Sequence, residues 1–259
     1  MAHRIDFSRL IVRYLDYVYK DTVQRRYVAQ RSCMERDPKA RFLDVGCQEG
    51  INTVRLARAI GTQHVFGLEY NRRTLHHAVH RGIRVMMGDA NRPLPLSDTS
   101  VDVVTAMDVL EHLVEPQMLV SEVYRVLRPG GYAVFATPNL ASWHNIFALL
   151  IGLQPFSGPN LTTMLDAELG VVRRVHRRAY GLPENGPVED CSEPEMLRHI
   201  VVIAYRSLLR LMERHGFQVE YARGFGYYPL PPLLARLFAR IDPWHTHHVV
   251  VKARKQATG

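Results

Sequence analysis

Three side chains capable of metal or proton chemistry stand together in one short run of the chain. This run, Asp108-Val-Leu-Glu111-His112, follows an apolar stretch of strand type. If a helix begins there, the two carboxylates and the imidazole fall at i, i+3 and i+4 and share one face. Such a facial set binds a divalent ion such as Mg²⁺, with Mn²⁺, Fe²⁺ or Zn²⁺ as alternatives. The spacing predicts a bound cation, and such a cation can lower the pKa of a hydroxyl group beside it.

His144 is a second candidate for proton transfer. It comes soon after Thr137-Pro-Asn139, where another predicted strand ends. Open α/β sheets bind ligands at the carboxyl ends of their strands, so His144 can face a bound substrate and act as a general base. Packing of this imidazole in a helix is the alternative. His247 and His248 are neighbours in a predicted strand and point to opposite faces, so we do not expect them to share an ion.

A turn of small residues precedes these groups in the chain. The run Phe42-Leu-Asp-Val-Gly-Cys-Gln-Glu-Gly50 contains Gly46 and Gly50, and a second apolar run ends in Glu69. Glycine lets the backbone pass close to a ligand, and a carboxylate on the second strand can accept hydrogen bonds from two ribose hydroxyls. The pattern predicts the front half of a nucleotide-binding βαβ unit.

Alternating strands and helices must position these groups. Strands are expected at 41–46, 64–68, 83–87, 101–106 and 132–137, and helices at 51–60, 72–81 and 117–127. This alternation implies a parallel sheet covered on both faces. Residues 6–35 precede it and predict one or two amphipathic helices. An irregular insertion with one helix near 142–152 follows, then a helix at 204–215 and strands at 217–222 and 247–253.

Composition limits the class of protein. The chain has 259 residues, 47% of them hydrophobic, and a formal net charge of +8. Its arginines are scattered apart from the cluster Arg173–Arg178, and no basic run alternates with aromatic residues, so a nucleic-acid partner is not expected. No apolar run is long enough for a transmembrane segment, and the N-terminus lacks a signal-peptide core. Three cysteines form no disulfide framework. We therefore expect a cytoplasmic protein.

A series of motifs extends the glycine turn. It runs through Asp44, the two glycines, Glu69, Gly88-Asp-Ala90, Leu94–Asp102 and Arg125–Gly131. In this order the series resembles class I S-adenosylmethionine-dependent methyltransferases, over about residues 40–140. The resemblance implies S-adenosylmethionine as the methyl donor.

The resemblance also assigns contacts with this cofactor residue by residue. It places Gly46 and Gly50 at the methionine end, Glu69 at the ribose hydroxyls, Asp89 and Ala90 at the adenine, and the backbone near Met107 at the amino group. Asp44 and Tyr70 complete the expected cofactor-binding set.

The 108–112 run is similar to the metal-binding Glu-x-x-Glu-His of ubiquinone-type O-methyltransferases and of small-RNA 2′-O-methyltransferases. Asp108 replaces the first glutamate of that motif. Those families add a histidine shortly before the helix that precedes the sixth strand, and His199 is the matching position. The resemblance thus implies a metal set of Asp108, Glu111, His112 and His199. The alternative is a metal-free site in which His112 only packs or hydrogen-bonds.

The expected fold is α/β: a Rossmann-like, seven-stranded methyltransferase sheet, parallel with one antiparallel strand, with helices on both faces and an inserted lid region. We expect an N-terminal helical segment at 1–38, the cofactor-binding core at 39–138, a substrate-side insertion at 139–202, and a C-terminal helix with an antiparallel hairpin at 203–259. The apolar, aromatic lid at 224–246 covers the site, forms a dimer contact or docks on a membrane surface; ordinary core packing is a further alternative.

The sequence predicts an S-adenosylmethionine-dependent O-methyltransferase, assisted by a divalent cation, that methylates a hydroxyl of a small molecule. A sugar is the preferred acceptor, because Trp143, Tyr227, Tyr228 and Trp244 suit stacking on sugar rings. The run 139–145 also looks like bacterial methyltransferases of glycan or natural-product pathways. A quinone, lipid or RNA acceptor is the first alternative, and a catalytically inactive binding module of the same fold is the second. A homo-oligomer is left open.

Overall fold

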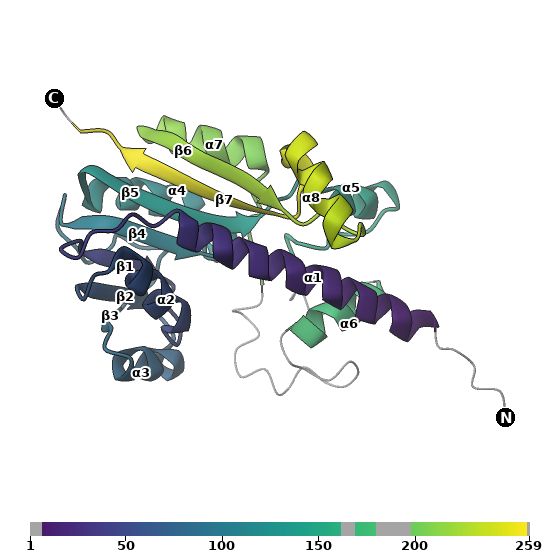
Figure 1. The fold of residues 1–259 in the computed structure, drawn as a ribbon, viewed down its shortest axis with the longest axis horizontal. Helices are drawn as coiled ribbons and strands as arrows, with labels where there is room; N and C mark the ends of the chain where they lie inside the picture. The colour runs from purple at the N-terminus through teal and green to yellow at the C-terminus, as the bar shows by residue number, and fades with distance from the viewer. Residues whose placement is uncertain (1–6, 162–168, 180–197, 258–259) are drawn as a thin grey trace.

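The chain folds around one seven-stranded sheet (Figure 1). The computed structural model describes residues 7–161, 169–179 and 198–257. In spatial order the strands are β3-β2-β1-β4-β5-β7-β6. Their bounds are β1 Phe42–Val45, β2 Val65–Glu69, β3 Arg84–Met87, β4 Val101–Met107, β5 Leu127–Pro138, β6 Phe217–Phe225 and β7 His248–Lys255. In the described sheet, β7 pairs antiparallel with both β5 and β6, and the other neighbouring strands pair in parallel. The predicted sheet with one antiparallel strand is confirmed.

Helices cover both faces of this sheet, as the sequence predicts. They are α1 Phe7–Ser32, α2 Ile51–Ile60, α3 Arg72–His80, α4 Pro116–Val126, α5 Trp143–Leu150, α6 Gly170–Ala179, α7 Tyr205–Arg214 and α8 Pro232–Ile241, with short 3-10 helices η1 Leu110–His112 and η4 Pro243–His245. One core cluster joins the sheet to α1, α2 and α3, and a second joins it to α4 and α7. In Figure 1, α1 crosses in front of the sheet, whereas α4 and α7 lie behind it. Among the residues that the structure describes, no helix has the length and apolar character needed to cross a bilayer.

Two helices lie where the sequence predicts irregular chain. The expected lid at 224–246 contains the end of β6 and all of α8. Pro231 and Pro232, which suggest a loop, occupy the N-cap and the first helical position of α8. Proline is tolerated there because its missing N–H has no partner in the first turn of a helix. The second unexpected helix, α6, lies in the insertion and packs against α1.

Two glycines at the end of β1 bring the surrounding loops close together. Gly46 and Gly50 have φ angles of +72° and +79°. A Cβ atom on Gly46 would lie 2.7 Å from the Val109 side chain, and one on Gly50 would lie 2.4 Å from Ile83. Any larger residue would clash, so the glycines let the β1 turn pack against the loop after β4 and against the residues just before β3.

Candidate active site

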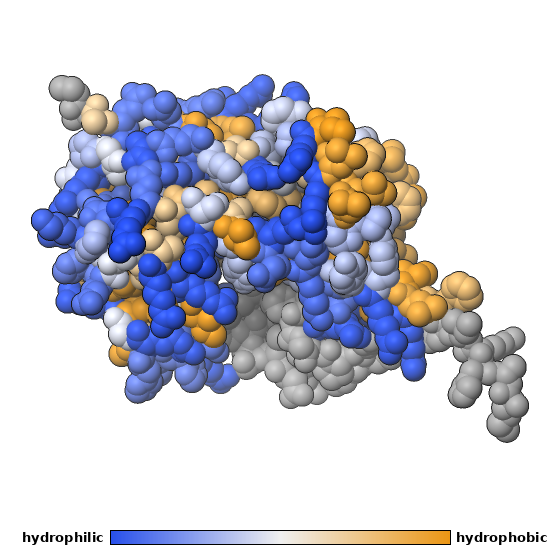
Figure 2. Space-filling model, viewed as in Figure 1, coloured by the Kyte–Doolittle hydropathy of each residue, from blue (hydrophilic) through white to orange (hydrophobic). Residues whose placement is uncertain are grey.

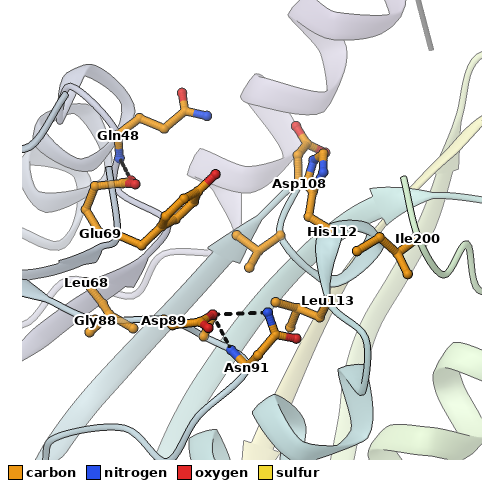
Figure 3. A pocket seen from close by; sticks show the side chains of 14 residues that line it. Gln48, Leu68, Glu69, Gly88, Asp89, Asn91, Asp108, His112, Leu113 and Ile200 are labelled. Atoms are coloured by element: carbon orange, nitrogen blue, oxygen red, sulfur yellow. Dashed lines mark hydrogen bonds between the residues drawn. The ribbon is translucent and has the colours of Figure 1, made fainter. Parts of the chain in front are cut away.

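A cavity of about 290 Å³ opens at the carboxyl ends of β1, β2 and β4 (Figure 3). Its lining consists of Gly46, Gln48, Leu68, Glu69, Tyr70, Gly88, Asp89, Ala90, Asn91, Asp108, Val109, His112, Leu113 and Ile200. Ligands bind at this edge in open α/β sheets. We refer to it as the cofactor pocket, after the cofactor-binding residues that the sequence predicts there.

Glu69 is the buried carboxylate of the cofactor pocket. Its Oε2 accepts a hydrogen bond from the Gln48 backbone N–H at 2.7 Å, and its Oε1 accepts one from the Asn71 N–H at 2.9 Å. Each carboxylate oxygen keeps a lone pair for a further donor, so the two backbone bonds orient the group without saturating it. Gln48 was not predicted as a site residue, because its contact with Glu69 is made by the backbone.

Four other predicted cofactor residues also line this pocket. They are Gly46, Tyr70, Asp89 and Ala90. Asp89 accepts hydrogen bonds from both the backbone and the side-chain nitrogen of Asn91, which fixes its carboxylate at the pocket wall (Figure 3).

Three predicted cofactor residues lie outside the pocket lining. Gly50 packs against Ile83, and Met107 packs against the core on the α1–α3 face. Asp44 is buried in β1, where it accepts hydrogen bonds of 2.5 Å from the hydroxyls of Thr53 and Thr105. Asp44 therefore ties β1 to α2 and β4 beneath the pocket floor.

The burial of Asp44 predicts a pH-dependent contribution to stability. Desolvation raises the pKa of its carboxyl from 3.8 to about 6 despite the two threonine hydrogen bonds. A raised pKa in an acid means that the native state binds a proton more tightly than the unfolded state does. The stability that protonated Asp44 gives the native state is therefore lost as pH rises from about 4 to about 6. Asp44→Asn should therefore gain stability relative to the parent protein across that range, by on the order of 3 kcal/mol. Urea unfolding at several pH values measures the difference; a difference that does not change with pH would contradict it.

Asp108 does not join the predicted metal set. The sequence predicts that Asp108, Glu111 and His112 share a helical face, and this is wrong: Asp108 precedes the 3-10 helix with a left-handed φ of 56°. Its two carboxylate oxygens pair with the two terminal nitrogens of Arg26, each at 2.8 Å. The buried guanidinium of α1 therefore holds this carboxylate in a bidentate pair.

Glu111, His112 and His199 do come together. One ligand atom from each lies within 4.8 Å of the others. His199 reaches the group because the backbone N–H groups of Ile200 and Val201 donate to the Glu111 carbonyl. Glu111 is buried, and its Oε2 accepts a hydrogen bond from the Thr137 hydroxyl at the end of β5.

Backbone carbonyls orient both imidazoles of this group. His112 Nδ1 lies 2.9 Å from the Arg198 carbonyl oxygen, and His199 Nδ1 lies 2.6 Å from that of Ser157. A carbonyl only accepts, so each Nδ1 carries the proton and each Nε2 keeps its lone pair. Histidines that bind a metal usually donate their other ring N–H to a carbonyl or carboxylate in this way. The donor set of two imidazoles and one carboxylate fits Zn²⁺, Mn²⁺ or Fe²⁺ better than Mg²⁺, which prefers oxygen.

The electrostatics of the group suit a cation. Burial, reinforced by the nearby Asp108 carboxylate, raises the pKa of Glu111 well above its ordinary value. Burial lowers the pKa of His112 and brings that of His199 to about 3. The imidazoles are therefore neutral at physiological pH, and a divalent cation would favour the ionised form of Glu111.

His144 lies away from the cofactor pocket, beside another histidine. Its Nε2 is 3.0 Å from the Ser157 hydroxyl and 3.2 Å from His247 Nδ1. Burial lowers the pKa of His144 to about 3. The rings of His247 and His248 are 5.2 Å apart, so the expectation that they point to opposite faces is wrong: β7 begins at His248, and His247 lies outside the regular pleat.

An apolar cavity of about 450 Å³ adjoins these histidines. We call it the apolar chamber; Leu15, Tyr19, Trp143, His144, Phe147, Phe156, Leu169, Val171, Val172, Val175, His176, Tyr228, Pro229 and His247 line it. A smaller cavity of about 90 Å³ shares Tyr19, Phe156, His176 and His247 with the chamber, and Asp108 and His112 with the cofactor pocket. It also contains Glu111 and His199. Glu111, His112 and His199 thus line a small cavity that shares residues with a polar pocket and with an apolar one.

Comparisons with known proteins agree with this geometry. Residues 43–135 match a family model described as a methyltransferase domain. A probable S-adenosylmethionine-dependent methyltransferase of Mycolicibacterium smegmatis is 42% identical over 108 residues, 41% of this chain and 40% of that protein. A ubiquinone biosynthesis O-methyltransferase of Klebsiella pneumoniae is 35% identical over 119 residues, 44% of this chain and 48% of that protein. The chain therefore spans less than half the length of these curated relatives.

The fold extends beyond the matched region. A crystal structure of an S-adenosylmethionine-dependent methyltransferase from Mesorhizobium loti has a TM-score of 0.55 at 20% identity, covering 87% of this chain and 95% of that one. The mixed seven-stranded sheet defines a Rossmann-like α/β domain, and its pocket lies at the sheet edge where such domains bind nucleotide-type cofactors. Residues 43–135 therefore match a methyltransferase domain, and the described fold is that of class I S-adenosylmethionine-dependent methyltransferases.

Proposed function

We propose that this protein transfers a methyl group from S-adenosylmethionine to a hydroxyl of an apolar small molecule. One observation carries the proposal: a small cavity lined by histidines and carboxylates shares lining residues with both the cofactor pocket and the apolar chamber. Glu69 would receive the ribose hydroxyls, and the acceptor would lie in the chamber with its hydroxyl in the cavity between. We also place the protein in the cytoplasm, where its buried thiols Cys33 and Cys47 stay reduced.

The chamber favours a quinone-type or lipid-type acceptor over the sugar that the sequence suggests. Its lining is dominated by aliphatic and aromatic side chains, which gain little from binding a ring covered with hydroxyls. Trp143 and Tyr227, predicted for stacking on sugars, are instead hydrogen-bonded to each other, Nε1 to OH, at 2.7 Å. One relative is named for ubiquinone biosynthesis, which is consistent with a quinone-type acceptor.

The histidines supply the proton acceptor. An alcohol or phenol must lose its proton as it attacks the sulfonium methyl group. His247 lines both the chamber and the smaller cavity, and its Nδ1 lies 3.2 Å from Nε2 of His144. Both imidazoles are neutral because burial lowers their pKa values. We infer that His247 takes the proton and that His144, the candidate base from the sequence, orients it.

Imidazoles with such low pKa values are weak bases, so the pKa of the acceptor hydroxyl must itself be lowered for it to give up its proton. Glu111, His112 and His199 would hold a divalent cation beside the same cavity. When bound, the cation supplies a Lewis acid that lowers the pKa of the acceptor hydroxyl. The chain's own contribution is to keep both imidazole lone pairs free, through the carbonyls of Arg198 and Ser157.

Methyl transfer from labelled S-adenosylmethionine tests the proposal. We expect a catechol with an alkyl chain to be methylated with a kcat/KM about tenfold or more above that of the unsubstituted catechol, since each buried methylene favours binding. Methyl glycosides should be poor acceptors. Equal rates for the two catechols, or a preference for glycosides, would contradict an apolar acceptor.

A Glu69→Ala variant serves as the cofactor control. It should bind S-adenosylhomocysteine about 10–100-fold more weakly by calorimetry, the effect of losing charge-assisted hydrogen bonds. Unchanged affinity would refute the ribose role. No binding of the cofactor product to the parent protein would instead favour the inactive binding module.

A further inference from the structure

An exposed apolar surface lies on helices α5 and α8, and two of its residues, Trp143 and Phe147, also line the chamber. On α8 it comprises Leu233, Leu234, Leu237, Phe238 and Ile241, and on α5 it comprises Trp143, Phe147, Leu149 and Leu150, all exposed. In Figure 2, hydrophobic atoms gather at the upper right, where Figure 1 shows α5 and α8. We call this surface the α5–α8 face.

Specific contacts hold the elements of this face together. The indole N–H of Trp143, at the start of α5, donates to the Asp242 carboxylate at the end of α8, at 3.1 Å. The Tyr14 hydroxyl of α1 donates to the Pro229 carbonyl just before α8, at 2.7 Å. Phe7, Leu10 and Ile11, nearer the start of α1, are also exposed. The apolar side chains therefore stand on a fixed scaffold of three helices.

Arginines lie directly beside the apolar residues. A small hollow between α1, β6 and α8 is lined by Arg25, Arg223, Arg236 and Arg240. The carboxylate of Asp21 pairs with two of them, Arg25 at 2.8 Å and Arg236 at 3.2 Å. Four guanidinium groups against one carboxylate leave this edge of α8 strongly positive.

We propose that the α5–α8 face docks on an anionic lipid surface. A helix with an exposed face of leucine and phenylalanine that arginines flank is typical of helices that lie in the plane of a membrane interface. The arginines of α8 match anionic headgroups in charge. A second copy of the chain would present the same positive edge, so a bilayer fits the charges better than a dimer does.

The docked position would place the chamber at the lipid. Trp143 and Phe147 line the chamber and are also 46% and 53% exposed on the α5–α8 face. An apolar acceptor dissolved in the bilayer would then enter the chamber without crossing water. This step rests on the proposed function, whereas the docking itself does not.

Flotation with lipid vesicles tests the docking. We expect the parent protein to float with phosphatidylcholine vesicles that contain about one third phosphatidylglycerol, and to float less as salt is raised. Leu237→Glu should reduce the bound fraction about tenfold or more, and Arg240→Ala should weaken binding about fivefold. The matched controls are Val79→Glu on α3 and Arg58→Ala on α2, both exposed positions on other helices, which should bind like the parent.

The outcomes separate docking from catalysis. No binding of the parent to anionic vesicles, or equal losses in Leu237→Glu and Val79→Glu, would overturn the docking. Light scattering that shows a dimer in the parent and a monomer in Leu237→Glu would assign the face to a second copy instead. Activity of Leu237→Glu on the unsubstituted catechol should stay at the parent level. Vesicle binding by a protein that methylates no acceptor would leave the docking intact and reject the proposed function.

Discussion

Glu111→Gln is expected to lose the bound divalent cation and to lower methyl transfer by more than about 100-fold. The amide keeps the shape of the carboxyl and can still accept from the Thr137 hydroxyl, but it lacks the charge that a cation requires. His199→Ala should have a similar effect, since it removes one imidazole of the same group.

Folding should survive in Glu111→Gln. Burial already raises the pKa of Glu111, so the neutral amide resembles the form that the buried site favours in the absence of a cation. The free energy of unfolding without metal should therefore stay the same or rise. A loss of activity in this variant reports on chemistry and not on unfolding.

Metal content and calorimetry provide readouts besides activity. Elemental analysis and titration with Zn²⁺ or Mn²⁺ should detect a site in the parent and none in Glu111→Gln. The control is His64→Ala, an exposed histidine before β2, which should keep the site. Affinity for S-adenosylhomocysteine should be unchanged in all three proteins, because Glu111 and His64 do not line the cofactor pocket. Full activity after exhaustive chelation, with no metal in the protein, would reject the cation.

The regular part of the fold was predictable because its signals are local. Each strand from 41 to 137 is a short apolar run, and each helix between them has apolar residues at helical spacing. The α8 helix was missed because Pro231 and Pro232 suggest a loop. The exposure of its apolar side chains also sets it apart from the core helices. Leu233, Leu234, Leu237 and Phe238 are exposed, so its hydrophobic pattern does not mark the side that faces the core. In most surface helices the apolar side packs against the core. In the described structure, most of the apolar side chains of α8 are instead exposed.

In the candidate site, too, some residues could be predicted from local sequence and others could not. Glu69 and Asp89 could be predicted because strand ends converge at one sheet edge. Asp108 could not be assigned correctly, because its partner Arg26 stands 82 positions earlier in the chain. His247 was set aside on strand alternation, which does not apply one residue before β7 begins. Sequence spacing shows which groups a strand or helix brings together, but not which distant side chain pairs with them.

The ion pair between Arg26 and Asp108 gives the second large expected effect, a loss of stability. Arg26→Met is expected to destabilise the protein by about 3–5 kcal/mol, the typical cost of removing one partner from a buried ion pair. Arg26 is 7% exposed, and besides Asp108 it contacts His248 Nε2 at 2.6 Å. Methionine fills similar space but leaves the Asp108 carboxylate without its bidentate partner. Arg25→Met, which removes a partly exposed pair within α1, should cost only about 0.5 kcal/mol.

The pH dependence of this loss identifies its cause. Arg26 lowers the pKa of Asp108 against the desolvation that raises it, so the variant should bind the Asp108 proton more tightly than the parent. The destabilisation by Arg26→Met should therefore shrink as pH falls and the carboxyl becomes neutral, and grow as pH rises. Adding Asp108→Asn should recover part of the loss, measured as a coupling energy in urea unfolding. Additive effects of the two substitutions, or a loss that is constant with pH, would mean that Arg26 stabilises by packing alone. Coupling would instead show that α1, which lies outside the matched methyltransferase domain, is fixed to the edge of the cofactor pocket by charge.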